Sequence, residues 1–282
     1  MKIIEYRLFF IESLATIYDV LEAEIFFYLV LENKNNLKRI DLALQRDLTF
    51  TGFEINIWNE ILEQLRAQIP IQYILGSTHF YDMVFDVNKN VLIPRPETEE
   101  LIDWIIKCNS NCSGLKVLDI GTGSGCIAIA LAKNLSNSAV FAIDVSKKAL
   151  ATAELNAKKN EVNVTFMEKN ILNTSDLEMQ FDIIVSNPPY VRNLEKGNMQ
   201  KNVLENEPHL ALFVDDEDPL VFYCKIADLA KRSLSKNGQL YFEINQYLGD
   251  DMIFLLQNKG FKNVALRRDI YGSHRMIKAI RG

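Results

Sequence analysis

Four consecutive residues near the middle of the chain combine an amide, two prolines and an aromatic ring. They are Asn187, Pro188, Pro189 and Tyr190, and the apolar run at 181–186 before them predicts a buried parallel strand. Two prolines fix φ and remove two N–H donors, which leaves the carbonyls of the turn available to a ligand. The Asn187 side-chain oxygen and the Pro188 carbonyl would each accept a hydrogen from a planar NH2 group, with Tyr190 laid against its plane. The pattern favours an amide or exocyclic amine as target, although Pro-Pro also commonly just ends a strand.

A glycine-rich turn lies upstream, between an apolar strand at 116–120 and a helical run that begins at Cys126. Glycines allow a cofactor to approach the backbone closely, and the helix N-terminus behind them offers free N–H groups. The spacing is G-x-G-x-G rather than the G-x-G-x-x-G of dinucleotide sites, and an aspartate stands two residues before the first glycine. These details favour an S-adenosyl-L-methionine site. Its candidate residues are Asp119, Gly121, Thr122, Gly123, Ser124 and Gly125.

Asp144 ends the next apolar strand, at 139–143. It follows the glycines by roughly twenty residues, a position from which a carboxylate takes both hydroxyls of a ribose. The alternative is a helix cap for the segment that starts at Ser146. Ser146 suits the cap better, so the ribose role is favoured.

Strands and helices alternate beyond Gly114, which predicts a mostly parallel, doubly wound sheet. The expected strands lie at 116–120, 139–143, 164–168, 181–186 and 238–244, and the expected helices at 126–133, 147–159, 219–234 and 247–258. Two closing strands, 262–267 and 275–280, should form an antiparallel hairpin. The polar stretch 191–218 is long for a compact domain and indicates a substrate loop or lid.

Residues 1–76 have a different pattern, in which apolar side chains recur at helical spacing between polar breaks. This predicts a small helical bundle. Residues 77–93 alternate like paired strands, with Asn88–Asn90 as the candidate turn, and indicate a β-hairpin linker. Pro96 then opens a helix at 97–107, and a catalytic domain is expected over 94–282.

Composition narrows the classes of function. The 282 residues, 48% of them hydrophobic, suffice for a catalytic domain and a smaller companion, and the net charge of −6 argues against a strongly electrostatic nucleic-acid binder. No apolar run approaches the ~20 residues that span a bilayer, and no signal-peptide pattern opens the chain, so we expect a cytoplasmic protein without a membrane partner. Four cysteines and three scattered histidines show neither a disulfide framework nor zinc-ligand spacing, so no metal is expected.

The chain resembles the HemK/PrmC family over essentially its whole length. The resemblance rests on the predicted bundle, the glycine turn and three further segments in this order: 70–76 (Pro-Ile-Gln-Tyr-Ile-Leu-Gly), 92–99 (Leu-Ile-Pro-Arg-Pro-Glu-Thr-Glu) and 186–190 (Ser-Asn-Pro-Pro-Tyr). It implies a Rossmann-like class I methyltransferase domain preceded by an all-α bundle. It also implies methyl transfer from S-adenosyl-L-methionine to the side-chain amide nitrogen (N5) of the glutamine in the Gly-Gly-Gln motif of class I peptide-chain release factors. The product would be S-adenosyl-L-homocysteine, and translation termination would be modulated.

By the family's pattern, Asn187–Tyr190 would hold the substrate glutamine, and Gly121–Gly125, Asp144 and Asn187 would hold the cofactor. This chain departs from the pattern at two places. Asn245 stands where the family usually has glycine, and Asn170-Ile171 stand where an acidic residue and often an aromatic one lie near the adenine. Asn170 would still hydrogen-bond the base, and Ile171 would pack on its face with less area.

Two alternatives remain at this point. An adenine-N6 methyltransferase acting on DNA or RNA shares Asn-Pro-Pro-Tyr, but it would need a basic approach to an extruded base, and residues 1–70 hold no Lys/Arg cluster. A binding factor that keeps the fold without catalysis is disfavoured by the complete Asn187 turn and glycine turn. Arg95, Glu97 and Glu207 are charged candidates for the site; their plain roles would be a helix-start ion pair between Arg95 and Glu97 and a solvated carboxylate at Glu207.

Overall fold

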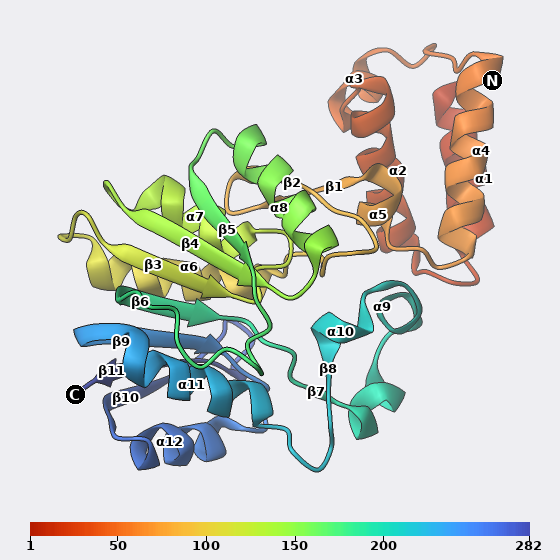
Figure 1. The fold of residues 1–282 in the computed structure, drawn as a ribbon. Coiled ribbons are helices and arrows are strands. Elements are labelled where there is room, and N and C mark those ends of the chain that lie inside the picture. Colours follow the sequence, from red (N-terminus) through yellow and green to blue (C-terminus); the bar gives the residue numbers. More distant parts are fainter. The chain divides into compact units, whose positions relative to one another are not determined.

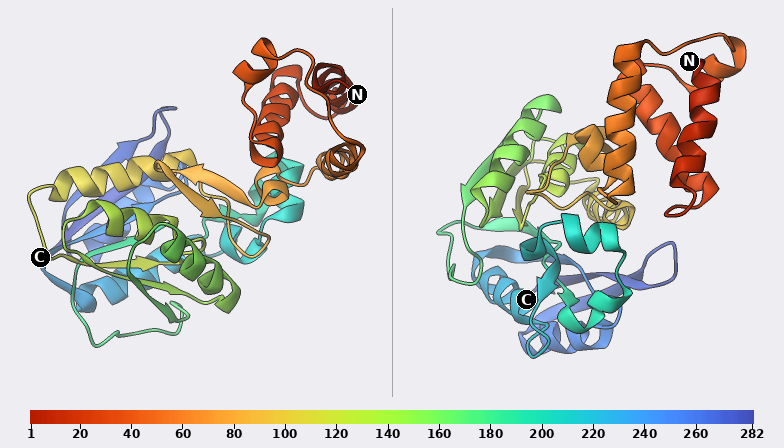
Figure 2. Two further views of the ribbon diagram at one scale, coloured as in Figure 1. Left: turned by 90° about the horizontal axis from the view of Figure 1, so that it is seen from above. Right: turned by 90° about the vertical axis from the view of Figure 1, so that its right-hand side faces the viewer.

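The computed structural model describes residues 1–282, apart from the side chain of Asn198, and the chain forms two compact units. The first unit consists of Met1–Gly76 together with Lys201–Asn206, and the second of Ser77–Gln200 together with Glu207–Gly282. Figure 1 and Figure 2 show the elements of each unit. Among the described residues, no helix combines the length and apolar character that crossing a membrane requires.

The first unit is the helical bundle that the periodicity predicts. Its helices are α1 (Ile3–Leu14), α2 (Val20–Asn35), α3 (Arg39–Leu44), α4 (Gly52–Arg66) and α5 (Ile71–Leu75). The core is aromatic: Trp58 is buried among Tyr6, Phe10 and Phe27, and the ring of Tyr6 stands edge-on to that of Trp58. Such pairs stabilise a small core beyond the area that they bury.

A short helix from far along the chain also belongs to the first unit. This helix, α9 (Lys201–Asn206), was not expected from the sequence to join the bundle. Its last residue, Asn206, donates from Nδ2 to the carbonyl oxygen of Gln68 at 3.2 Å. The polar stretch after the Asn-Pro-Pro-Tyr turn therefore passes through the first unit before it returns to the second.

The second unit is built on a seven-stranded sheet, with strand order β10-β11-β9-β6-β3-β4-β5. The strands are β3 (Lys116–Ile120), β4 (Ala139–Asp144), β5 (Val164–Glu168), β6 (Phe181–Ser186), β9 (Leu234–Glu243), β10 (Phe261–Arg268) and β11 (His274–Arg281). The pairs among β3, β4, β5, β6 and β9 are parallel, and β11 is antiparallel to both of its neighbours. The predicted mostly parallel sheet with a C-terminal antiparallel hairpin is confirmed.

Helices cover both faces of this sheet (Figure 1). They are α6 (Pro96–Asn109), α7 (Cys126–Asn134) and α8 (Lys147–Lys159) on one side, and α11 (Val221–Ser233) and α12 (Gly249–Asn258) on the other. Neighbouring strand residues serve opposite cores, so that Val117 packs with α6 and α7 and Leu118 with α11. Burial on both faces explains why these strands read as continuous apolar runs.

A two-stranded hairpin of β1 (Ser77–Phe80) and β2 (Met83–Asp86) precedes the sheet. The prediction that Asn88–Asn90 joins the paired strands is wrong, because Tyr81 and Asp82 make the turn, with φ of +50° and +57°. These values suit a two-residue hairpin loop, which usually carries Asn-Gly. Here Glu99 of α6 holds the turn by accepting from the Tyr81 N–H at 2.9 Å, a contact that no local pattern reveals.

The polar stretch 191–218 has short elements of its own. They are β7 (Val191–Arg192), the 3-10 helix η1 (Asn193–Asn198), α9, α10 (His209–Leu212) and β8 (Phe213–Val214). Strand β7 pairs in parallel with β8, which brings the two ends of the polar stretch together. A role as substrate loop or lid stays a prediction.

Candidate active site

A cavity of about 320 Å³ lies in the second unit, at the carboxyl ends of the parallel strands. Open α/β sheets place their ligands at this edge. Eight residues predicted from the sequence line it: Gly121, Gly123, Asp144, Asn170, Ile171, Asn187, Pro188 and Pro189. Leu210 and Ala211 of α10 and Phe222 of α11 add apolar wall that the sequence did not indicate.

The glycine turn forms one wall of the cavity with bare backbone. Gly121 and Gly123 have φ of +75° and +55°, and a Cβ added at either would meet no atom within 4 Å. Gly125, with φ of +84°, is required for packing instead, because a Cβ there would lie 3.0 Å from Ala153 and Ile129 side-chain atoms. Only glycine adopts this path without strain, and it leaves space for a ligand against the first two positions.

Asp144 is held at the cavity by backbone amides. Its Oδ2 accepts from the Gly123 N–H at 2.9 Å, and its Oδ1 accepts from the Ser146 N–H at 2.8 Å. Ser146 is the N-cap residue of α8 and accepts from the Ala149 N–H at 3.2 Å. Asp144 is therefore not the cap, and each carboxylate oxygen keeps lone pairs for a second donor.

Asp119 lies beneath the glycine turn rather than on the cavity wall. Its side chain is fully buried, and Oδ2 accepts from the Thr122 hydroxyl at 2.6 Å. Ser124 is likewise held from below, because its carbonyl accepts from Asn156 Nδ2 at 2.9 Å. The structure thus gives Asp119, Thr122, Ser124 and Gly125 a supporting place behind Gly121 and Gly123.

Burial raises the pKa of Asp119 to about 7. The same carboxyl in an unfolded chain titrates at about 3.9, so between these values the folded state holds a proton that the unfolded state has released. The free energy of unfolding should therefore fall as pH rises across this window, by up to roughly 4 kcal/mol. In thermal melts at pH 5 and pH 8, Asp119→Asn should show a smaller change in Tm than the unsubstituted protein. An equal change in both proteins would contradict the assignment.

The Asn-Pro-Pro-Tyr turn is fixed at its start by Ser186, whose hydroxyl donates to the Ile120 carbonyl at 2.6 Å. Asn187 follows, and its Nδ2 donates to Thr98 Oγ1 of α6 at 3.4 Å. The partner of this NH2 group is thus a threonine hydroxyl from α6. Among the described residues no hydrogen bond reaches the Pro188 carbonyl, which leaves that oxygen for a ligand.

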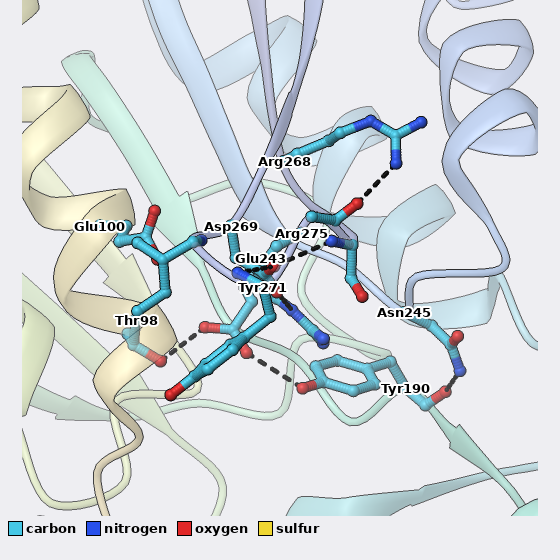
Figure 3. A network of polar contacts seen from close by, with 12 residues as sticks. Thr98, Glu100, Tyr190, Glu243, Asn245, Arg268, Asp269, Tyr271 and Arg275 are labelled. Atoms are coloured by element: carbon cyan, nitrogen blue, oxygen red, sulfur yellow. Dashed lines mark hydrogen bonds and ion pairs between the residues drawn. The ribbon is translucent and has the colours of Figure 1, made fainter.

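Tyr190 is placed behind the turn and is not among the residues that line the cavity. Its hydroxyl donates to Glu243 Oε1 at 3.0 Å, and its carbonyl accepts from Asn245 Nδ2 at 3.1 Å (Figure 3). Burial, together with the charge of Glu243, raises the pKa of the Tyr190 hydroxyl. In this structure Tyr190 anchors the turn.

Sequence reasoning missed Thr98, Glu243 and Asn245 as parts of the site. Thr98 is buried in the first turn of α6, and Glu243 and Asn245 lie at and just beyond the carboxyl end of β9. One signal was available, because Glu243 follows an apolar strand in the same way that Asp144 does. Asn245, where the family pattern has glycine, uses its amide to hold the Tyr190 carbonyl.

The plain roles considered for Arg95, Glu97 and Glu207 do not match the structure. Arg95 Nη2 pairs with Glu207 Oε1 at 2.6 Å rather than with Glu97. Glu207 is not a solvated loop carboxylate, since its side chain is 1% exposed, and it also accepts from the Ile93 N–H at 3.4 Å. This pair ties the segment before α6 to the polar stretch 191–218.

A doubly wound sheet with an antiparallel β11 beside β9, a glycine turn after β3 and a carboxylate at the end of β4 matches the class I methyltransferase fold. Known proteins agree. A family model described as methyltransferase small domain matches residues 103–211. The crystal structure of a methyltransferase from Pyrococcus furiosus has the same fold, with a TM-score of 0.56 and 18% identity, and the match covers 78% of this chain and 99% of that one.

Two proteins found by sequence comparison have a much higher identity to this chain. Release factor glutamine methyltransferase of Flavobacterium psychrophilum is 62% identical over 99% of this chain and 99% of its own. The protein of the same name in Bacteroides thetaiotaomicron is 42% identical over 96% and 97%. The chain belongs to the family of release factor glutamine methyltransferases, which confirms the resemblance seen in its motifs.

Proposed function

We propose that this protein transfers a methyl group from S-adenosyl-L-methionine to N5 of the glutamine in the Gly-Gly-Gln motif of class I peptide-chain release factors, and that it does so in the cytoplasm, where termination occurs. The observation that carries the proposal is the Asn187 turn at the cavity. Its amide is tied to Thr98 through Nδ2, and the Pro188 carbonyl has no described partner. Two acceptor oxygens are thereby offered to an NH2 group, while family membership supports the release factor as its source.

The residues present fit the cofactor. The bare backbone at Gly121 and Gly123 suits the methionine portion, and Asp144 suits the ribose hydroxyls. Asn170 and Ile171 line the cavity beside them and would face the adenine; Asn170 Oδ1 already accepts from the Leu172 N–H at 3.0 Å, which leaves its NH2 for the base. Bound there, S-adenosyl-L-methionine supplies an electrophilic methyl group.

The enzyme's own residues would do the rest by positioning. A glutamine amide nitrogen is a poor nucleophile because its lone pair is delocalised into the carbonyl. If Asn187 Oδ1 and the Pro188 carbonyl accept its two hydrogens, the nitrogen is oriented, its electron density is raised, and the positive charge that develops on it as the new C–N bond forms is stabilised. No base is required at the motif. The amide nitrogen keeps both hydrogens when it accepts the methyl group, and the resulting cation is so acidic that it loses one proton to water.

Asp144→Ala should weaken binding of S-adenosyl-L-methionine while the fold is kept. Hydrogen bonds to a charged group contribute about 1.5–3 kcal/mol, which corresponds to a loss in affinity of about 10- to 100-fold. Calorimetric titration measures it, with a thermal melt to verify folding. Unchanged affinity would remove Asp144 from the ribose site.

We further propose that the bundle of residues 1–76 recognises the release factor outside its Gly-Gly-Gln loop. A separate helical unit has no part in methyl transfer, and remote contacts supply binding energy that positions the reacting group. Helix α2 offers such a surface, because Leu21, Ile25 and Leu29 recur every four residues and are 71%, 57% and 41% exposed. Exposed apolar patches often mark protein-interaction sites.

The competing substrate is adenine in nucleic acid, which the net charge of −6 disfavours. A direct test incubates the protein with labelled S-adenosyl-L-methionine and either a release factor or DNA. Label should enter the release factor and should be lost when its Gly-Gly-Gln glutamine is replaced by alanine. Label in DNA instead would overturn the proposal.

A further inference from the structure

A buried carboxylate, which the chemistry described above does not use, lies behind the Asn187 turn. Glu243 ends β9, and the residue is 1% exposed. Its two oxygens accept from two hydroxyls, Oε2 from Thr98 Oγ1 at 2.5 Å and Oε1 from the Tyr190 hydroxyl at 3.0 Å. Figure 3 shows these donors meeting the carboxylate from α6 and from the turn. Burying an ionised carboxylate costs free energy, and such groups are often found at functional sites.

Titratable or charged groups of α6, α7, α11 and β11 lie near Glu243, the buried thiol of Cys126 on α7 among them. Arg275 of β11 is the nearby cation and is itself engaged, with Nε donating to Asp269 Oδ2 at 3.0 Å. Glu97 of α6 adds a repelling charge, and the Tyr223 hydroxyl of α11 donates to the Glu243 carbonyl at 3.2 Å. Burial raises the pKa of Glu243, while the hydroxyls of Thr98 and Tyr190 and the charge of Arg275 oppose that shift.

The Thr98 hydroxyl has only one proton, and this restricts its neighbour. When that proton is donated to an ionised Glu243, Thr98 Oγ1 has only lone pairs left to offer. The Asn187 side chain, 3.4 Å away, must then turn its NH2 toward Thr98, because its oxygen would face another acceptor. The Asn187 Oδ1 therefore points away from Thr98.

We propose that Glu243 is a positioning residue that sets the direction of this hydrogen-bond chain, so that Asn187 presents its oxygen to the substrate amide. The same carboxylate holds Tyr190, and both ends of the Asn-Pro-Pro-Tyr turn are therefore fixed from one point. The inference rests on the proposed role of Asn187 as acceptor. It assigns no contact between Glu243 and the substrate.

Glu243→Gln is the direct test, because it keeps size and shape while replacing one acceptor oxygen by an NH2 donor. Whichever way the new amide turns, Thr98 or Tyr190 loses its acceptor. If Thr98 loses it, its proton is released toward Asn187, whose amide then flips. We expect kcat on release factor to fall by about 10- to 100-fold, as for other partners that orient a functional group. The KM for release factor and the affinity for S-adenosyl-L-methionine should stay within about twofold.

Two substitutions at Thr98 distinguish the effect of its hydrogen bonds from the effect of its packing. Thr98→Val removes the hydroxyl and should lower kcat like Glu243→Gln, whereas Thr98→Ser keeps the hydroxyl and should retain near-normal kcat. Glu100→Gln is the control for loss of a carboxylate on the same helix; Glu100 accepts from the Ile270 N–H at 3.0 Å, a bond that glutamine also forms. Its kcat should be unchanged.

The pH profile adds a readout that a purely structural role would not move. Since the ionised form is required, kcat should fall as pH drops through the raised pKa of Glu243. That acid limb should be absent in Glu243→Gln, while any limb due to other groups, Asp119 among them, remains in both proteins.

Three results would overturn the inference. The first is an unchanged kcat in Glu243→Gln. The second is an equal fall in kcat in Thr98→Val and Thr98→Ser. The third is a fall in kcat in Glu243→Gln that comes with a similar fold-loss of cofactor affinity and a lower Tm. Failure of the unsubstituted protein to methylate a release factor would instead reject the proposed function. The two failures are therefore distinguishable.

Discussion

Asn187→Ala is expected to lower single-turnover methylation of release factor by about 10²- to 10³-fold, the usual loss for one preorganised contact at a reacting group. Removal of the side chain deletes the oxygen that we propose accepts from the substrate amide. It also leaves the Thr98 hydroxyl without the NH2 group that it accepts from. Rapid-quench measurement with labelled S-adenosyl-L-methionine isolates this step from product release.

Asn187→Asp should be hardly better, although it keeps the shape of the side chain. An ionised aspartate has no NH2, so it would place an oxygen against the lone pairs of Thr98, whose proton is already donated to Glu243 at 2.5 Å. Thermal melts and cofactor titration on both variants ensure that a collapsed site is not mistaken for lost chemistry. Near-normal turnover in Asn187→Ala would refute the amide clamp and leave orientation to the rest of the turn.

Removing residues 1–76 should raise KM for intact release factor by at least about 100-fold, and should raise it far less for a short Gly-Gly-Gln peptide. The reason is that interfaces rely on a few residues worth about 2 kcal/mol or more each, and a peptide reaches only the cavity. Steady-state kinetics on the two substrates gives the comparison. An equal loss on both would show that the bundle merely stabilises the catalytic domain.

Truncation also disturbs α9, because Asn206 Nδ2 donates to the Gln68 carbonyl and the next residue, Glu207, pairs with Arg95. Single substitutions on the exposed face of α2 avoid this. Leu21→Lys and Ile25→Lys should each raise KM for release factor by roughly tenfold without changing kcat on the peptide. Leu155→Lys is the matched control, since Leu155 is 61% exposed on α8 of the other unit.

Much of the site followed from local sequence. Gly121, Gly123, Asp144 and Asn187 all lie where an apolar strand ends, and such ends share one edge of a parallel sheet. Periodicity and strand-to-helix alternation therefore predicted the fold class and eight of the residues that line the cavity. Ser146 as the cap of α8 was likewise readable, because a cap involves only neighbours in sequence.

Tertiary structure decided the partners of those residues. Thr98 and Glu243 are 145 positions apart, and Arg95 and Glu207 are 112 positions apart, so no spacing rule joins them. The hairpin turn at Tyr81 and the place of α9 beside the bundle were also beyond local patterns.

The physical reason is a difference in range. Strand and helix periods act between near neighbours, so the sequence by itself predicted the residues at the strand ends, such as Asp144 and Asn187, that reach the cavity. Which side chains hydrogen-bond one another behind the cavity depends on how β9, β11 and α6 pack together. That packing is settled only when the whole chain is folded. That Asn187 lies at the cavity therefore followed from the sequence, whereas its hydrogen bond to Thr98, and with it the orientation of its side-chain amide, followed from the tertiary structure.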